Sequence, residues 1–583
     1  MAVLQAGILA VVALIITPGF LFYFDVTPKV TLLLVGAAAL LLLGRPEWSR
    51  FHWLLLLGWL SLAISTAFSA NPALSAFGTN WRRLGTVEYG AIFVFVGGVA
   101  AHVSGRPGRL RIILRGVSLT TLLAALYGIS QYFGYDPWLP QSGYHIGEGI
   151  WTIVRPPSTF GYVSYFANWL VFAVFLNLAL ASIETNVKLR YLAWGGAALA
   201  AFALILTGTR AAMVGLLAGL AYGYIRRGAR LNRRVVLGGA AAVLVLAGFY
   251  YSPAGWPLRS RTRWFIEDPR GGARLYLWRD SLRMALDRLP VGYGPEVFTA
   301  QFPRYASLEL AVAFPNFAHE SPHNMFLDAF VGQGIPGLAI LVAICWFALR
   351  GRAEPWFAAA LAGGLVAQQF TVFTAPTALI FYLTVALASP APVSLIPKRI
   401  WFPLAVPVSV ALLVVATRLF VSDYHLERSR QAAAARGIIQ AAAQYRTYDR
   451  WRLPGTGADL WYSRAMTSLA GTPPYSVVRL QAAAQAGLAA LRATKTAEDP
   501  FNAWYTVAQL YSAQGDAANA ERSLRQAVAA SPRWFKPHWM LARLLQLENR
   551  HQEACAAAAL AARLNGNRDR EVTETWRQIQ LSH

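Results

Sequence analysis

Charged residues are scarce in this chain. Asp, Glu, Lys and Arg make up 14% of the 583 residues, whereas they make up about a quarter of a typical soluble domain. This shortage excludes an ordinary soluble protein of this length. The sequence is instead 56% hydrophobic, with long apolar runs such as residues 31–44, 90–101 and 235–251. Since about 20 helical residues cross a hydrocarbon core of about 30 Å, we predict a polytopic membrane protein.

Acidic residues and cysteines are also few. Lys and Arg number 52 against 28 Asp and Glu, which gives a net charge of +24. In a soluble protein this excess would suggest nucleic acid, but here the arginines flank the apolar runs and orient membrane helices. We therefore expect no nucleic-acid partner. The two cysteines, Cys345 and Cys555, provide neither a disulfide framework nor a metal cluster, and we expect no metal site.

The arginines predict the topology of an all-α bundle. We expect about 12–13 transmembrane helices within residues 1–422. The first apolar run lacks the basic start and cleavage site of a signal peptide, so we predict that it is a retained span. Alternate short loops are basic, and the positive-inside rule places them and the N-terminus in the cytoplasm. The long loop 252–322 and residues 423–583 then lie on the outer side of the membrane. The predicted spans are residues 2–24, 29–44, 51–69, 86–103, 111–134, 161–183, 190–207, 211–225, 234–251, 323–349, 355–373, 376–391 and 400–421.

Residues 423–583 lack apolar runs of membrane length and are rich in alanine and arginine. From Phe501 onward they follow the 34-residue tetratricopeptide pattern, a second and weaker copy follows, and residues 461–493 suit a further helical pair. An alanine-rich helical bundle is the alternative. Either fold suits the binding of a protein partner better than catalysis. The first copy rests on Trp504, Ala508, Tyr511, Gly515, Ala520, Leu524, Ala527 and Pro532.

A polar cluster, HESPHN, precedes the apolar run near residue 325. Ser321 and Pro322 are a helix-start signal, with serine as N-cap and proline at the first helical position. His323 would then lie in the first turn, where the helix dipole favours a neutral ring that can accept a proton. Alternatively, His323 only anchors the helix at the lipid headgroups. The same run should kink, because it contains Gly332, Gly334, Pro336 and Gly337.

Several arginines fall at the predicted outer ends of spans. Arg210 is flanked by small residues, and its planar guanidinium matches phosphate oxygens. Residues 270–298 predict an amphipathic helix on the outer membrane surface or over a cavity, flanked by Arg274 and Arg279. Arg155 precedes another span. For each arginine alone, snorkelling to the headgroups is the alternative. The apolar stripe of the amphipathic helix is Leu275, Trp278, Leu282 and Leu286.

These segments resemble the O-antigen ligase and polymerase superfamily over about residues 1–420. The resemblance is carried by TGTRAAMVG, RLYLWRDSLRM, LPVGYGPEVF, RPPSTFGYVSYFANWL and SPHNMFLDAFVGQGIPGL. It implies a membrane glycosyltransferase of the GT-C type that needs neither a metal nor a cofactor. Such enzymes take a glycan from a polyprenyl (undecaprenyl) diphosphate carrier at the periplasmic face. They pass it to a hydroxyl of lipid A–core, of another glycan or of a protein.

The resemblance also implies residue roles. His323 matches the histidine proposed to activate the acceptor hydroxyl, and Arg210 with Arg274 or Arg279 matches the arginines proposed to hold the diphosphate. The repeat-like tail is not part of the common core and favours a protein acceptor or partner. Our first hypothesis is an O-antigen ligase-like enzyme of lipopolysaccharide biosynthesis. The alternatives are an O-antigen or exopolysaccharide polymerase, a protein O-oligosaccharyltransferase and a non-enzymatic lipid or polysaccharide exporter. Further substrate-binding candidates are Arg155, Trp278, His319, Glu320 and Asn324.

Overall fold

The computed structural model of the protein describes residues 1–44, 47–146, 152–228, 233–267, 272–351, 354–388, 394–471 and 477–581. Helices dominate it, which confirms the all-α prediction, and the described strands are short antiparallel pairs. β1 (Glu47–Trp48) pairs with β4 (Ser394–Leu395), and β2 (His145–Ile146) pairs with β3 (Ile153–Val154). Some residues of the predicted basic loops and of the predicted amphipathic segment 270–298 fall outside the described residues. They include Arg45, Arg230, Arg270 and Arg352.

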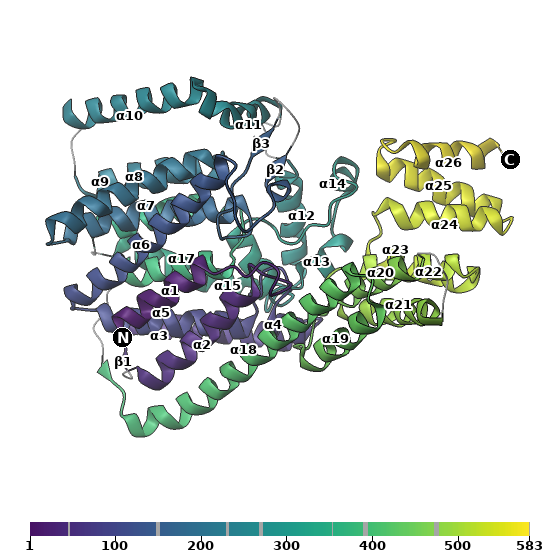
Figure 1. The fold of residues 1–583 in the computed structure, drawn as a ribbon, viewed down its shortest axis with the longest axis horizontal. Helices are drawn as coiled ribbons and strands as arrows, with labels where there is room; N and C mark the ends of the chain where they lie inside the picture. Colours follow the sequence, from purple (N-terminus) through teal and green to yellow (C-terminus); the bar gives the residue numbers. More distant parts are fainter. Residues whose placement is uncertain are drawn as a thin grey trace.

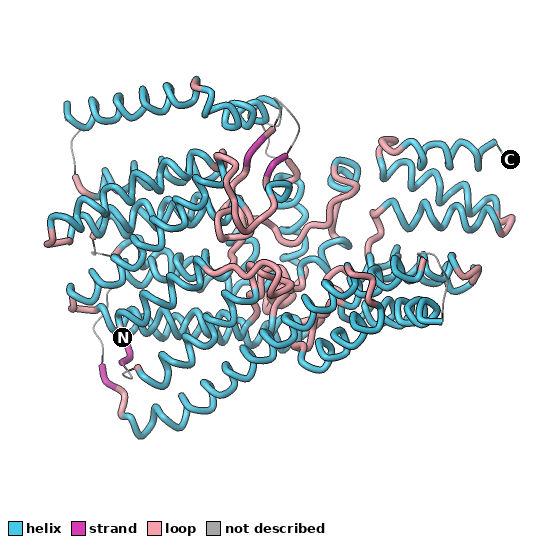
Figure 2. Tube along the Cα trace, in the orientation of Figure 1, coloured by secondary structure: helices cyan, strands magenta, loops and turns pink. Residues whose placement is uncertain are grey.

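The helices form a bundle and a tail (Figure 1). The irregular chain gathers mostly between the two parts (Figure 2). The bundle contains α1 (Ala2–Leu14), α2 (Thr27–Leu43), α3 (Arg50–Ala67), α4 (Pro72–Phe77), α5 (Thr86–Val103), α6 (Pro107–Tyr132), α7 (Val163–Ile183), α8 (Val187–Leu206), α9 (Arg210–Arg226), α10 (Arg233–Tyr251), α11 (Trp256–Glu267), α12 (Arg274–Leu286), α13 (Phe298–Gln301), α14 (Leu308–Ala313), α15 (Met325–Arg350), α16 (Pro355–Ala367) and α17 (Ala375–Ala388). α18 (Lys398–Ala434) leads into the tail, which contains α19 (Ile438–Trp451), α20 (Asp459–Ala470), α21 (Val477–Thr496), α22 (Pro500–Ala513), α23 (Ala517–Ala530), α24 (Phe535–Leu547), α25 (His551–Asn565) and α26 (Arg570–Leu581).

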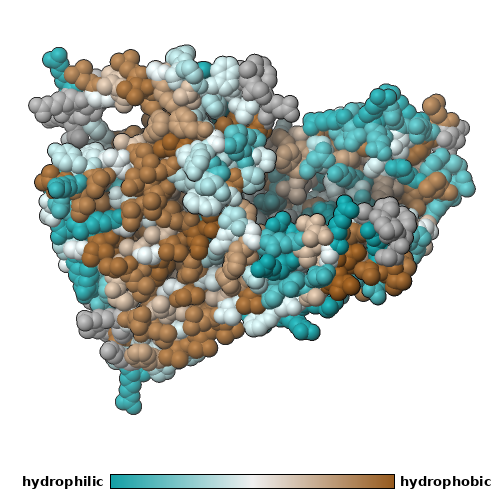
Figure 3. Space-filling model, viewed as in Figure 1, coloured by the Kyte–Doolittle hydropathy of each residue, from teal (hydrophilic) through white to brown (hydrophobic). Residues whose placement is uncertain are grey.

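Among the described residues, six helices are long and apolar enough to cross a membrane: α5, α6, α7, α8, α15 and α18. A seventh span is added if α10 and α11, bent by 83°, are counted together. The protein is therefore a multi-pass membrane protein, and Figure 3 shows hydrophobic side chains over much of the bundle. The predicted count of 12–13 also includes α1, α2, α16 and α17, which are apolar helices of 10–17 residues and fall below this length. The predicted span 2–24, for example, contains a helix that ends at Leu14, before the turn at Pro18 and Gly19.

α7 is the central helix of the bundle. Its large side chains Phe166, Trp169, Phe172 and Phe175 are fully buried, and it packs against α6, α8, α16 and α17. Gly364 in α16 lies against the ring of Phe172, where a Cβ would overlap it. Close approach of this kind, permitted by glycine, is a common way to pack membrane helices without a hydrophobic driving force. The buried α7 therefore holds in place the four helices that pack around it.

α15 is broken in the middle, which confirms the predicted kink. Gly334 has φ 67° and ψ −159°, outside the helical region. At the break, the backbone N–H of Ile335 donates to the carbonyl of Leu289 at 2.8 Å, and that of Gly294 donates to the carbonyl of Gly332 at 2.9 Å. These bonds replace helical ones, so the break binds α15 to the turn that follows α12.

The tail consists of paired helices. α20 packs on α21, α22 on α23, and α24 on α25, and Gly515 turns the chain between α22 and α23 with φ 75°. Ala503, Ala508, Ala520 and Ala527 are fully buried, so small residues lie where helices approach closely. The pairing agrees with the repeat pattern, whereas the tetratricopeptide assignment stays a prediction. The predicted domain boundary after residue 422 falls within the continuous helix α18.

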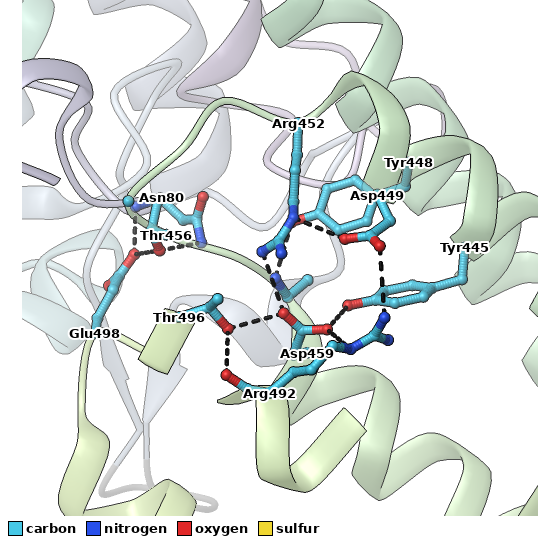
Figure 4. A network of polar contacts seen from close by, with 12 residues as sticks. Asn80, Tyr445, Tyr448, Asp449, Arg452, Thr456, Asp459, Arg492, Thr496 and Glu498 are labelled. Atoms are coloured by element: carbon cyan, nitrogen blue, oxygen red, sulfur yellow. Dashed lines mark hydrogen bonds and ion pairs between the residues drawn. The ribbon is translucent and has the colours of Figure 1, made fainter. Parts of the chain in front are cut away.

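Polar contacts join the tail to the bundle (Figure 4). The carboxylate of Glu498 accepts a hydrogen bond from the backbone N–H of Asn80, a residue 418 positions earlier in the chain. The Asn80 side chain donates to Thr456 at 3.1 Å. Nearby, Asp459 accepts from Arg452 at 3.1 Å and from Tyr445 at 2.9 Å. Asn80 lies in the loop between α4 and α5, so these contacts fix the tail to the end of the bundle that carries this loop.

Candidate active site

Four arginines from separate segments meet at one cavity of about 290 Å³ at this end of the bundle. Arg155 follows β3, Arg210 and Arg274 are the first residues of α9 and α12, and Arg261 lies in α11. The predicted residues Arg155, Arg210, Arg274 and Trp278 are therefore brought together. Their guanidinium groups are close enough for Arg155, Arg210 and Arg274 to repel Arg261. Such a concentration of fixed positive charge favours an anion with several negative charges.

Neighbouring groups orient these arginines. Arg155 donates to the hydroxyl of Tyr162 at 3.1 Å, and its guanidinium carbon lies 5.2 Å from the centre of that ring. Arg274 donates to the backbone carbonyl of Phe370 at 3.4 Å, and the Phe370 ring contacts Trp278 with centroids 5.7 Å apart. Aromatic rings therefore border the cavity. A hydroxyl group holds the guanidinium group of Arg155, and a backbone carbonyl holds that of Arg274.

Asn168 from α7 also lines the cavity. Its side chain is 1% exposed, and neither its amide nitrogen nor its amide oxygen has a hydrogen-bond partner among the described residues. A buried amide without partners costs free energy, and such groups in native proteins call for an explanation. A ligand in the cavity can supply both a donor and an acceptor to this amide.

His323 precedes α15, which corrects its predicted position in the first helical turn. Its φ is 50°, in the left-handed region, and its backbone N–H donates to Ser321 Oγ at 3.2 Å. The N-cap of α15 is Asn324, whose Oδ1 accepts from the N–H groups of Phe326 at 3.0 Å and Leu327 at 3.1 Å. The sequence pattern placed the start of the helix three residues too early, because the N-cap is Asn324 and not Ser321.

The environment of His323 keeps its ring neutral. Burial, and then the positive charge of Arg274 and the neighbouring His319, lower the pKa of His323 to about 4. The expected neutral form is therefore supported, although by burial and like charge instead of the helix dipole. His323 thus feels the charges of Arg274 and His319, although it is not among the residues that line the arginine cavity.

The other candidates lie outside the arginine cavity. Arg279 forms ion pairs with Asp280 at 3.1 Å and Glu309 at 3.2 Å. His319 contacts the ring of Phe302 and lines a second cavity, between loop 302–319 and the tail. Glu320 is exposed. The structure thus separates Arg279, His319 and Glu320 from the arginines that surround Asn168.

Sequence reasoning missed Arg261 and the ion pairs of Arg82. Arg261 belongs to a basic stretch, RSRTR, in the long loop, and the helical spacing of that stretch was the available signal. Arg82 is buried and pairs with Glu296 and with Asp328, the latter at 3.3 Å. Asp328 lies in the first turn of α15, so this buried pair holds the start of α15 against the loop after α4.

The helices and the cavity define a multi-pass membrane protein with a cavity lined by four arginines at one end of its bundle. Residues 195–342 match the family Wzy_C, O-antigen ligase. The chain therefore carries an O-antigen ligase family domain, which contains Arg210, Arg261, Arg274 and His323. No curated protein matches the chain. Family membership implies the transfer of a glycan from a lipid carrier.

Proposed function

We propose that the protein transfers a glycan from a polyprenyl diphosphate carrier to an acceptor hydroxyl at the periplasmic face, as an O-antigen ligase-like enzyme. The observation that carries this proposal is the cavity where Arg155, Arg210, Arg261 and Arg274 meet. A diphosphate leaving group carries several negative charges, and fixed guanidinium groups stabilise the charge that develops as it departs.

The rim of the cavity suits a lipid-linked donor. Val214 and Leu275 line it, and their side chains are 53% and 58% exposed. Trp278 and Phe370 add aromatic surface beside Arg274. We propose that the polyprenyl chain lies along the exposed apolar residues while the diphosphate contacts the arginines. Asn168 then forms hydrogen bonds with the diphosphate or the first sugar.

His323 is the proposed base. The acceptor oxygen forms a bond to the anomeric carbon, the bond between that carbon and the diphosphate oxygen breaks, and the diphosphate keeps the electron pair. The hydroxyl proton passes to the neutral ring of His323. A pKa of about 4 makes the free ring a weak base. A bound diphosphate brings negative charge beside Arg274 and raises this pKa towards the working pH.

Purified protein in nanodiscs tests the proposal. We expect it to release undecaprenyl diphosphate and to form a glycosylated acceptor, with EDTA leaving the rate unchanged. His323→Ala and Arg210→Ala should abolish transfer, whereas Arg279→Ala, which alters an exposed pair on the same face of the protein, should retain it. Export of lipid-linked glycan into vesicles without any transfer would contradict the proposal and favour an exporter.

A further inference from the structure

A second cavity of about 320 Å³ lies between the bundle and the tail. One wall is loop 302–319 of the bundle, and the other is formed by tail residues of α20, α22 and the turn before α24. His319 lines it at the bundle side. Since His319 and His323 are four residues apart, their Cα atoms are at most about 14 Å from each other.

The second cavity reaches His319 and the arginine cavity reaches Arg274, while His323 itself is not among the residues that line either one. Arg274, which lines the arginine cavity, and His319, which lines the second cavity, are the two side chains whose charges act most strongly on His323. A group-transfer enzyme needs two substrates to meet at its base. The donor occupies the arginine cavity in the proposed function. The second cavity, lined by His319 four residues before His323, is therefore left for the other substrate.

The wall contributed by the tail is fixed in place. Arg533 donates to the carbonyl of Ala306, and Arg568 donates to the carbonyl of Ala313 at 2.8 Å. Between these bonds, Leu308 and Ala311 of α14 pack against a buried cluster that includes Phe535. Polar and apolar contacts therefore hold loop 302–319 on the tail, and the cavity is a built feature of the folded chain.

The lining combines aromatic rings with positive charge. Phe302, Phe314, Phe317 and Trp534 contribute rings, and the Phe317 side chain is 71% exposed. Arg464, Arg533 and Lys536 contribute three cations, against one lining carboxylate, that of Asp499. Sugar rings stack their C–H faces on aromatic side chains, and the surplus of cations favours phosphate or carboxylate groups.

We propose that this cavity binds the acceptor, and that the acceptor is a saccharide chain that carries anionic groups. The tail then forms half of the acceptor site. This inference rests on the proposed function, because it needs a transfer reaction at His323. It assigns the tail a role in substrate binding, whereas a repeat-like domain by itself would indicate a protein partner.

Acceptor kinetics test the assignment with variants whose side chains have few structural contacts. Lys536→Glu reverses one lining charge, and Phe317→Ala removes an exposed ring. Lys495→Glu is the matched control, because Lys495 is an exposed lysine of the tail on α21 and lies outside the residues that line the cavity. The acceptor probes are a core oligosaccharide with phosphomonoesters, the same oligosaccharide after phosphatase treatment, and a serine-containing peptide.

For the phosphorylated oligosaccharide, we expect Lys536→Glu and Phe317→Ala to raise the acceptor KM about five- to tenfold. The donor KM should not change, and Lys495→Glu should match the wild type. Phosphatase treatment should raise the wild-type KM and reduce the effect of Lys536→Glu. Wild-type transfer with an unchanged acceptor KM in both variants would overturn the cavity assignment alone. Wild-type transfer to the peptide only would overturn the saccharide class, and no transfer to any probe would overturn the proposed function itself.

Discussion

The side-chain amide of Asn324 donates a hydrogen bond of 2.8 Å to Oε1 of Gln369. Gln369 directly precedes Phe370, whose carbonyl accepts from Arg274. Asn324 also caps α15 and directly follows His323. One residue thus sets the start of the helix, the position of the histidine and the distance from the histidine to the arginine cavity.

The pH dependence of transfer should identify His323 as the base. Burial and Arg274 lower its pKa to about 4, so the ring is neutral above that pH and becomes charged below it. The acid limb of kcat/KM for the donor should therefore lie near pH 4 instead of near 6.5. The His319→Gln variant should keep the same acid limb, so the measurement distinguishes a role of His323 from a role of His319. A limb between pH 6 and 7 in the wild type would contradict the assignment.

Asn324→Asp should move that limb to higher pH. The variant keeps an oxygen acceptor at the cap but adds a negative charge next to His323, which favours the imidazolium form. We expect a shift of about one pH unit, with little loss of thermal stability. Asn324→Leu, which removes the cap and adds no charge, is the comparison and should lower stability without the upward shift.

Arg210 and Arg274 should matter far more than Arg279. Alanine at either of the first two positions removes a charge that faces the diphosphate, and we expect kcat/KM to fall about 10²- to 10³-fold. Arg279→Ala breaks an exposed ion pair with Glu309 and one with the buried Asp280, which keeps its ion pair with Arg283 and its hydrogen bond from the backbone N–H of Ser307. Such pairs contribute little, so we expect an effect of less than about threefold. Equal losses in all three variants would argue against the cavity as the donor site.

Asn168→Leu should separate stability from activity. The amide is buried and has no partner among the described residues, so its removal should leave the melting temperature unchanged or raise it. Transfer should fall about tenfold or more if the amide binds the donor. Asn168→Asp is a second test, because a carboxylate beside the arginines should repel the diphosphate. A stability loss with full activity in the leucine variant would assign Asn168 a structural role.

Two glycines of α15 should respond differently to alanine. Gly334 has a left-handed φ, and a Cβ there would overlap the carbonyl of Leu289. Gly334→Ala should cost roughly 1–3 kcal/mol or more of stability. At Gly332 the nearest atoms to an added Cβ are 3.7 Å away, so Gly332→Ala should be close to neutral. Thermal unfolding in detergent measures both, and equal melting temperatures would contradict the strain at Gly334.

Glu498 should make tail docking pH-dependent. Burial raises the pKa of Glu498 to about 7, above the usual value near 4.5. The docked state therefore binds the proton more tightly, so docking is most stable below about pH 4.5 and weakens as the pH rises through 7. Glu498→Gln mimics the protonated form. Between pH 5 and 8.5 the wild type should lose on the order of 1–3 kcal/mol of docking stability relative to this variant. Parallel pH profiles for the two proteins would contradict this coupling.

The sequence predicted the elements better than their relative positions. Arg274 and Arg279 flank the same apolar stripe, but five residues at 3.6 per turn place them about 140° apart around α12. Arg274 therefore faces the cavity with Trp278, and Arg279 faces Glu309. Arg261 joins the site because α11 packs against β3 and Arg261 donates to the carbonyl of Gly208, just before α9. No local pattern encodes these tertiary contacts. His323 was found from its residue type, and the N-cap was assigned three residues too early.

The apolar runs predicted where helices would lie, but the helices formed are in several cases shorter than the runs. A hydrophobic run continues through a turn such as that at Pro18 and Gly19, whereas the helix ends. Likewise, the domain boundary predicted from the change in composition falls inside α18. Composition changes where the chain leaves apolar surroundings, and a helix can continue past that point without a break.

The 37 residues of α18 form one uninterrupted rod of about 55 Å. Pro403 and Pro407 lie near the start of this helix, and residues 408–434 contain neither proline nor glycine. This later part of α18 has no joint at which the tail could swing freely, so a force on the distal helices is passed to the bundle as a tilt of the helix. A molecule that grips the tail would thereby pull on the loop that carries Asn80.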